Sequence, residues 1–347
     1  MSVVNQASHR QAASTAPADA DVMRSRLRMM MLIRRFEERT YQEYTKPGQR
    51  IGGFCHLYSG QEAVAVGIAA VFEKGRDYLI NGYRDHGHSL ALGMDVKPAM
   101  AELFGRTTGC SGGKGGSMHF FQVEAGNMGG HGIVGGQIPL GAGLAFACRY
   151  RGNGGVAFTL FGDGALNQGS FAESMNLASL WKLPCIFICE NNGMAMGTHV
   201  RRSSAESDLS KRGLGFAMPC RNVNGNKLDE VIEALGDACK RARSGEGPSY
   251  LVMNTYRFRG HSMSDPLKYR TRDELERARQ QDPIVLYREQ LRKAGLVNDE
   301  MLEDMEQQIA AEVDEAVQFA NSSPHPEPQA LFTDVLVEKY PLSKDDV

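Results

Sequence analysis

The chain has 347 residues, of which 42% are hydrophobic and 23% are charged, and its formal net charge is −2. A chain of this composition can bury a large core, and without a basic surplus it offers no surface for a polyanion, which argues against binding of nucleic acid. No apolar run is long enough to cross a bilayer, so we expect no membrane association.

The seven cysteines include no Cys-x-x-Cys pair, which argues against a zinc or disulfide framework. Cys185 and Cys189 fall within an apolar run, where buried reduced thiols are the usual state. This pattern predicts a reducing, intracellular compartment. The N-terminus lacks the hydrophobic segment of a secretory signal, and the acidic Asp19 and Asp21 argue against a mitochondrial transit peptide. We therefore expect a cytoplasmic protein rather than one of the mitochondrial matrix.

The first elements of the chain are an arm and two helices. Residues 1–21 are rich in Ala, Ser, Gln and Asn without apolar periodicity, which predicts a disordered arm. Val22 to Tyr44 and Gln61 to Phe72 then show the apolar spacing of helices. His56 lies between them among apolar and aromatic neighbours, and on the residues alone a hydrogen-bonded structural histidine is the favoured interpretation.

A short buried strand is predicted from Asp77 to Ile80, and polar residues follow it directly. Tyr83 and Arg84 stand at the strand end, where an arginine fork can bind diphosphate oxygens. His86 and His88 could suggest a metal, but two histidines without a further ligand cluster are a weak signal for zinc.

Two glycine-rich segments fail the standard nucleotide motifs. Thr107 to Ser117 has five glycines around Lys114, but Gly115 replaces the hydroxyl residue that a phosphate loop needs after its lysine, so we interpret it as mobile backbone that allows close packing. In the second segment a helix is predicted from Pro139 to Arg149. Gly141 and Ala145 give it a small-residue face for close approach to another element, including one in a second subunit.

The dinucleotide fingerprint also fails, because Phe146 stands where the third glycine belongs. This argues against a nicotinamide enzyme.

A strand, a helix and a second strand are predicted in the middle of the chain, at Val156 to Phe161, Phe171 to Trp181 and Cys185 to Cys189. The buried side of this helix is expected to carry Phe171, Met175, Ala178 and Leu180.

Polar residues follow both of these strands. Asp163 comes after the first and Asn192 after the second, and a right-handed crossover places both strand ends at the same edge of a parallel sheet. A carboxylate, an amide oxygen and a backbone carbonyl suit Mg²⁺ or Ca²⁺ with a diphosphate. Gly164 allows close approach of that ligand, and a helix starting near Gln168 would point its amides toward it. Either motif alone is usually a turn or loop, whereas the pair at two strand ends is specific.

The remaining elements complete an α/β fold with a parallel sheet flanked by helices. A helix is predicted from Lys227 to Arg243, a strand from Pro248 to Tyr256, and a loop from Arg257 to Tyr269. Two charged helical stretches follow, with solvated faces as the default explanation of their charge. We expect one α/β domain over residues 22–270 and a helical C-terminal extension over residues 271–347 packed on the same domain.

The spacing of Gly162-Asp163-Gly164 and Asn191-Asn192 is similar to the signature of enzymes that bind thiamine diphosphate through magnesium. The segment from Gly132 to Gln137 resembles a glycine-rich cofactor element of the same enzymes. With the segments Phe54 to Tyr58 and Gly260 to Pro266, the chain from about residue 22 onward resembles the alpha subunits of heterotetrameric thiamine diphosphate-dependent 2-oxo acid dehydrogenases, of the pyruvate dehydrogenase type.

The resemblance implies a thiamine diphosphate-binding fold and a set of site residues. The implied magnesium ligands are Asp163, Asn192 and the carbonyl of Met194. The implied cofactor contacts are Tyr83, Arg84, Gly132, Val134, Asp163, Gly164, Ala165, Asn192, Met194 and His261. His56 and His261 match positions that face the substrate end and the diphosphate end of the site, which assigns both a catalytic role. Relatives commonly have arginine and tyrosine where this chain has Gly193 and Met194; a carbonyl ligand survives that change, whereas ring packing does not.

The resemblance also implies an incomplete active site. In these enzymes a glutamate activates the cofactor, and Glu62, the nearest candidate, lies in a motif that does not supply this acid in alpha subunits. The implied assembly has two alpha and two beta subunits, with the glutamate on the beta subunit. It would decarboxylate pyruvate and pass the acetyl group to a lipoyl-bearing acyltransferase core. The lipoyl group would enter through a funnel lined partly by the loops Arg201 to Arg212 and Arg257 to Tyr269.

Alternatives stay open within and outside this chemistry. The substrate could be acetoin or a branched-chain 2-oxo acid, because a few pocket residues decide the choice. The chain could instead be a catalytically silent scaffold subunit. The region around Ser262 resembles a loop that is phosphorylated in some relatives, although bacterial-type members generally lack that control.

Overall fold

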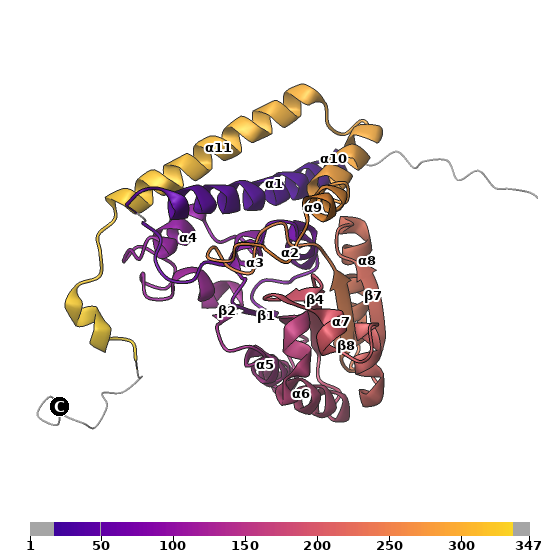
Figure 1. Cartoon of the computed structure of the whole chain (residues 1–347). Helices are drawn as coiled ribbons and strands as arrows, with labels where there is room; N and C mark the ends of the chain where they lie inside the picture. Colours follow the sequence, from indigo (N-terminus) through magenta and orange to yellow (C-terminus); the bar gives the residue numbers. More distant parts are fainter. Residues whose placement is uncertain (1–16, 49, 336–347) are drawn as a thin grey trace, which may run out of the picture.

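The computed structural model describes residues 17–48 and 50–335, and a six-stranded sheet lies at its centre (Figure 1). The strand order is β2-β1-β3-β4-β8-β7, and every neighbouring pair is parallel. The strands are β1 (Tyr78–Gly82), β2 (Asn127–His131), β3 (Ala157–Gly162), β4 (Cys185–Asn191), β7 (Cys220–Asn224) and β8 (Ser249–Asn254). A short antiparallel ribbon, β5 (Met194–Ala195) with β6 (Thr198–His199), lies just after β4.

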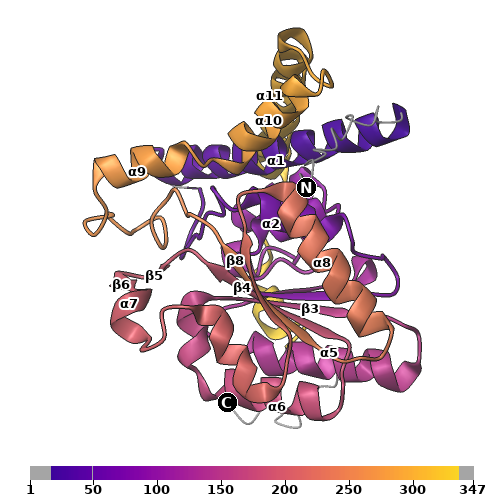
Figure 2. The ribbon, with the colours of Figure 1, turned by 90° about the vertical axis from the view of Figure 1, so that its right-hand side faces the viewer.

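Helices cover both faces of the sheet, with α2 (Glu62–Ala69) and α8 (Leu228–Arg243) on one side and α5 (Gln137–Arg151) and α6 (Gly169–Leu180) on the other (Figure 2). Side chains alternate along β4: Ile186 and Ile188 join the core under α8, whereas Phe187 joins the core under α6. A strand buried on both faces needs apolar residues at every position, which explains the continuous apolar run predicted here.

A third layer of helices is formed by α1 (Pro17–Thr45), α10 (Pro283–Lys293) and α11 (Asp299–Ser322); α1 and α10 pack on α2, and α11 packs on α1 and α4 (Val96–Leu103) (Figure 1). The charged C-terminal stretch contains three helices rather than the two predicted, because α9 (Arg272–Arg279) ends before Pro283 starts α10. The stretch is not merely a solvated face, since α11 buries Ile309 and Val313 in the core that it shares with α1 and α4. No helix in the described ranges is both long and apolar enough to cross a membrane.

The shorter elements connect this framework. They are α3 (His86–Ala91), α4 (Val96–Leu103), α7 (Val200–Ser203) and the 3-10 helices η1 (Gly116–Met118), η2 (Val123–Ala125), η3 (Asp163–Asn167), η4 (Leu209–Phe216) and η5 (Pro328–Phe332).

Three predictions about the elements were wrong in detail. The arm was predicted to extend to residue 21, but α1 begins at Pro17, because proline suits the first helical turn and Asp19 complements the helix dipole there; residues 1–16 lie outside the described part. The strands β2 and β7 were missed, since both are sheet edges whose glycine-rich or polar sequences need no apolar run. Leu180 is 70% exposed, because it lies two residues after Ala178 and points away from the core.

The small-residue face of α5 packs within the chain and not on a second subunit. A Cβ at Gly141 would lie 2.0 Å from Thr159 Oγ1 on β3, and Ala145 is fully buried. The prediction of close approach to another element is therefore confirmed for β3.

Two glycines of α5 should respond in opposite directions to alanine. Gly141→Ala forces a methyl group into Thr159 and should destabilise the chain by about 1–3 kcal/mol. Gly143→Ala meets no atom within 4 Å and should stabilise the chain by about 0.5–1 kcal/mol, because alanine is the better helix former. Urea unfolding of both variants checks this; equal effects would contradict the packing of α5 on β3.

Candidate cofactor site

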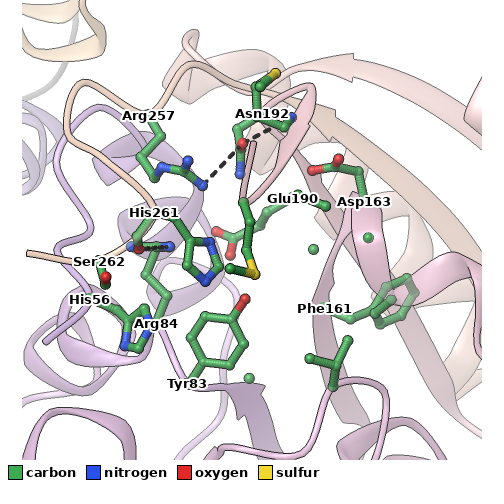
Figure 3. Close-up of a pocket in the computed structure, with 18 of the residues that line it drawn as sticks. His56, Tyr83, Arg84, Phe161, Asp163, Glu190, Asn192, Arg257, His261 and Ser262 are labelled. Atoms are coloured by element: carbon green, nitrogen blue, oxygen red, sulfur yellow. Dashed lines mark hydrogen bonds between the residues drawn. The ribbon is translucent and has the colours of Figure 1, made fainter. Parts of the chain in front are cut away.

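A cavity of about 880 Å³ opens at the carboxyl ends of β1, β3 and β4 (Figure 3). The chain turns to opposite sides of the sheet from β1 and β3, and ligands of open α/β sheets bind at such a switch point. Tyr83, Arg84, His56 and His261 lie on one side of this cavity, and Asp163 lies on the other. The structure thus brings together residues predicted from four separate segments.

Oxygen donors gather at one end of the cavity. Asp163 follows β3, Asn192 follows β4, and Met194 begins β5. The register pairs Gly162 with Glu190, so the two strand ends lie side by side. Asp163 is 3% exposed, and the Asn192 backbone amide donates to its carboxylate. These positions confirm that the crossover brings the two motifs to one edge.

The donor set fits a hard divalent cation. Burial raises the pKa of Asp163, so its ionised form is poorly compensated, and within the described residues it forms no ion pair. A cation beside this carboxylate would reverse that effect. A carboxylate, an amide oxygen and a backbone carbonyl from Asp163, Asn192 and Met194 are the ligand types that Mg²⁺ prefers.

Two arginines make the neighbouring wall positive. Arg84 Nη1 donates to Leu57 O at 2.7 Å and Nη2 donates to His261 O at 2.8 Å, so Arg84 ties two cavity loops together. Arg257 is 1% exposed, and its Nη1 donates to Asn192 Oδ1 at 3.3 Å. Burial and the nearby Arg84 lower the pKa of Arg257 to about 10. The two guanidinium groups therefore favour an anionic ligand in this cavity.

Small residues keep backbone accessible around the same cavity. A Cβ at Gly164 would lie 2.7 Å from Ala195 Cβ, so only glycine fits between η3 and the β5 ribbon. Ala165 is buried beside it, whereas Gly132 and the 45% exposed Val134 line the opposite mouth. A Cβ at Gly132 would meet only the His119 ring, at 3.6 Å. These residues line the part of the cavity in which we expect the diphosphate, from the resemblance to thiamine diphosphate enzymes.

His56, Tyr83 and His261 form a ring cluster on the cavity wall. The His56 ring centroid lies 4.5 Å from that of Tyr83 and 5.3 Å from that of His261. Nδ1 of each histidine is buried and has no hydrogen-bond partner among the described residues. The bonded structural histidine that the residues alone favoured is therefore wrong for the His56 side chain, because no described group accepts from or donates to its Nδ1.

Both histidines are held neutral. Burial, with Arg84 next, lowers the pKa of His56 to about 2 and that of His261 to about 4. At physiological pH each imidazole is therefore neutral, with one ring nitrogen protonated and the other carrying a free lone pair.

Stability should fall with acid because of these two groups. Their folded pKa values lie below the unfolded value of 6.5, so the unfolded chain takes up protons that the folded chain refuses, and stability is lost as pH falls below about 6.5. Urea unfolding at pH 7 and pH 5 should show a smaller loss for the His56→Gln, His261→Gln double variant than for the wild type. Substitution of the exposed His325 by glutamine should keep the wild-type loss; an unchanged loss in the double variant would contradict the assignment.

Sequence reasoning missed two cavity residues. Arg257 could have been found because it follows β8, the neighbour of β4 in the sheet. Glu190 is the last residue before the paired asparagines, and its side chain accepts from the Tyr58 hydroxyl and lies 3.1 Å from His88 Nε2. A single charged residue in an otherwise apolar strand was the available signal.

Three further predictions concern Glu62 and the two loops that were expected to line the entrance funnel. Glu62 does not line the cavity; it is fully buried and paired with Arg34 Nε at 2.6 Å. Besides Arg257, six residues of the Arg257 to Tyr269 loop line the cavity, namely His261, Ser262, Ser264, Asp265, Pro266 and Tyr269. No described residue from Arg201 to Arg212 lines it, because that segment folds into α7 and the start of η4 beyond the β5 ribbon.

The first glycine-rich loop encloses a side chain of the protein itself. The Glu102 carboxylate is fully buried and accepts four backbone N–H bonds of 2.7 to 2.9 Å, from Ser111, Gly113, Gly115 and Gly116. Backbone amides converge here as they do around phosphate in a nucleotide loop, but the anion is a glutamate. The close packing predicted for this segment is confirmed, and the packed group is now identified.

Comparison with known proteins agrees with this geometry. Residues 28–329 match the family model described as the dehydrogenase E1 component. The chain is 50% identical over 324 residues to the pyruvate dehydrogenase E1 component subunit alpha of Zymomonas mobilis, covering 93% of this chain and 91% of that protein. It is 51% identical over 311 residues to the same-named protein of Rhizobium meliloti, covering 89% and 88%. It is 47% identical over 301 residues to the testis-specific mitochondrial form of Rattus norvegicus, covering 86% and 75%. The chain belongs to the dehydrogenase E1 component family.

Proposed function

We infer that this chain is the alpha subunit of a pyruvate dehydrogenase E1 component, which with a beta subunit decarboxylates pyruvate oxidatively with the aid of thiamine diphosphate. The observation that carries this conclusion is the cavity at the carboxyl ends of β1, β3 and β4, with oxygen donors at one end, the Arg257 guanidinium beside them and the Arg84 guanidinium on the wall that carries His261. The named relatives, which are about half identical over most of the chain, support the same activity.

The chain would hold the cofactor through its diphosphate and a magnesium ion. Asp163, Asn192 and the Met194 carbonyl would bind Mg²⁺, and Arg84 and Arg257 would stabilise the negative charge next to it. When bound, thiamine diphosphate supplies an electron sink for loss of carbon dioxide from a 2-oxo acid. His56 and His261 are neutral and each has a buried Nδ1 without a partner among the described residues, so each could form a hydrogen bond to a bound ligand at the cavity wall.

The acid that activates the cofactor would come from the beta subunit. Three carboxylates line the cavity within the described chain, and each has another role. Asp163 belongs to the metal end, and Glu190 accepts from Tyr58. Asp265 accepts from the backbone amides of His261 at 2.7 Å and Leu267 at 3.0 Å. Since each lining carboxyl group of the described residues already has a role, this supports our proposal that a second chain supplies the acid.

An exposed apolar surface supports this partner. Phe54 and Val134, which line the cavity, are 66% and 45% exposed, and Ile133, next to Val134 in the chain, is 78% exposed. Aromatic residues continue along the outer side of α5, where Tyr150 is 84% exposed and stacks on Phe146. Apolar surface of this extent is characteristic of subunit interfaces. We propose an assembly of two alpha and two beta subunits in the cytoplasm, with a lipoyl-bearing acyltransferase core as acceptor of the acetyl group.

One reconstitution tests the function. The isolated chain should not release carbon dioxide from pyruvate, and addition of its beta partner with thiamine diphosphate and Mg²⁺ should start turnover. Parallel assays with acetoin and branched-chain 2-oxo acids should give lower kcat/KM than pyruvate. Full turnover by the isolated chain would contradict the shared active site, and preference for another substrate would replace pyruvate in the assignment.

A further inference from the structure

Three buried polar residues outside the cavity form a connected cluster, which we call the Glu37–His86–Ser117 cluster. Glu37 comes from α1, His86 begins α3, and Ser117 lies in η1; their exposures are 0%, 0% and 3%. His86 Nδ1 lies 3.1 Å from both Glu37 oxygens, and Nε2 lies 3.0 Å from Ser117 O and 2.9 Å from Ser117 Oγ. None of the three lines the cavity.

The cluster has the spacing of a serine–histidine–acid triad, but its hydrogen bonds run in the opposite direction. Here the histidine donates toward the serine, whereas in a triad it accepts from the serine hydroxyl. A backbone carbonyl only accepts, so His86 Nε2 must donate to Ser117 O, and an ionised Glu37 requires Nδ1 to donate as well. His86 is then an imidazolium; burial lowers its pKa, but Glu37, Asp85 and the Ser117 carbonyl together raise it, and the net shift is upward. A doubly protonated ring cannot take a proton from Ser117, and full burial excludes substrate. The cluster therefore has no nucleophile, and another role must account for it.

The cluster holds the backbone that carries His56. The His56 N–H donates to Ser117 Oγ at 3.0 Å, and the Tyr58 N–H donates to Glu37 Oε1 at 2.9 Å. The amides of two residues in one short segment, His56 and Tyr58, are thus bound by two members of the cluster. The His56 side chain itself has no hydrogen bond at Nδ1 within the described structure, so its position depends on this backbone and on ring packing against Tyr83.

The glycine-rich loop fixes the serine in turn. Glu102 binds the amides of Gly115 and Gly116, which directly precede Ser117. The Glu102 carboxylate on α4 is therefore connected to the cavity wall. The connection runs through hydrogen bonds to the loop amides, along the chain to Ser117, and through the hydrogen bond from the His56 amide to Ser117 Oγ.

We propose that Glu37, His86 and Ser117 are positioning residues that fix the His56 imidazole in the cavity. The inference deepens the proposed function, since it rests on His56 acting in turnover. A catalytic side chain displaced by about 1 Å can lose up to about 100-fold in rate, so loss of one member of the cluster should be visible in kcat.

The test is a double-mutant cycle between Ser117 and His56 in the reconstituted complex. Ser117→Ala removes the acceptor of the His56 amide but keeps the Ser117 carbonyl, so the Glu37–His86 pair remains. It should lower kcat with pyruvate about tenfold when His56 is present, and less than about twofold in a His56→Ala background, because residues that act through one group are not additive. Equal losses in both backgrounds would overturn the proposal.

Hydrogen exchange provides a readout that does not depend on activity. In Ser117→Ala, amide exchange of the 54–58 peptide should accelerate at least about tenfold, whereas binding of thiamine diphosphate with Mg²⁺, measured by calorimetry, should stay within about twofold. Ser174→Ala is the matched control, because among the described residues the hydroxyl of this buried serine bonds only to Ser170 O of its own helix, at 2.7 Å. Unchanged protection of the 54–58 peptide would overturn the cluster's role. A wild-type complex that ignores pyruvate would refute the proposed function instead, with the exchange result still deciding whether the cluster holds the backbone.

Discussion

Replacing Asp163 by asparagine should abolish turnover of the reconstituted complex, with a loss of at least about 10³-fold in kcat/KM. The substitution keeps the shape but removes the only negative charge among the proposed magnesium ligands, so the metal and the diphosphate lose their common anchor. Calorimetry should show that Mg²⁺ no longer promotes binding of thiamine diphosphate. An active Asp163→Asn complex would contradict the metal assignment, and it would favour the silent scaffold subunit as the alternative.

The same substitution should stabilise the isolated chain. Burial raises the pKa of Asp163 in the folded state, so at pH 7 its ionised form opposes folding, and an uncharged amide removes that penalty. Thermal unfolding without metal should therefore give a higher Tm for Asp163→Asn than for the wild type. Asp237→Asn is the control, because this carboxylate on α8 is 61% exposed and should change neither Tm nor activity. A lower Tm for Asp163→Asn would indicate that its hydrogen bonds outweigh its burial.

Replacing Arg34 by methionine should produce the largest loss of stability, about 3–5 kcal/mol. Arg34 binds both oxygens of Glu62, at 2.6 and 3.0 Å, and donates to Asp282 at 2.8 Å, joining α1 to α2 and to the start of α10. Methionine fills similar space but leaves the fully buried Glu62 without a counter-charge. Urea unfolding of the isolated chain at pH 7 measures the effect.

A second arginine of α1 provides the comparison. Arg28 pairs with Glu312 at 2.6 Å, but the two side chains are 34% and 35% exposed. Its replacement by methionine should cost less than about 1 kcal/mol, because exposed ion pairs are screened by water. Equal losses at both positions would show that burial of the Glu62 carboxylate does not determine the effect.

The sequence predicted the interior of the sheet and the metal end of the cavity because both depend on local patterns. β3 and β4 are buried on both faces and therefore carry continuous apolar runs, and the parallel crossover between them forces Asp163 and Asn192 together. Edge strands lack that requirement, so β2 and β7 gave no apolar signal. Their pairing is decided by the strands beside them.

The residues that sequence reasoning missed are those whose role depends on distant partners. Arg257 follows β8, and only the order of strands in the sheet places it beside Asn192. Glu190 is bonded to Tyr58, 132 residues away in the chain. Contacts between polar residues so far apart in the sequence produce no periodic pattern along the chain. The apolar periodicity that predicts a strand therefore cannot predict these contacts.

The loop around Glu102 is a binding site whose ligand is attached to the same polypeptide. Covalent linkage gives this glutamate an effective concentration that free phosphate or nucleotide in a cell cannot match, so the amides of Ser111, Gly113, Gly115 and Gly116 are occupied whenever the chain is folded. The geometry next to Ser117 is therefore set by folding and is insulated from changes in metabolite level.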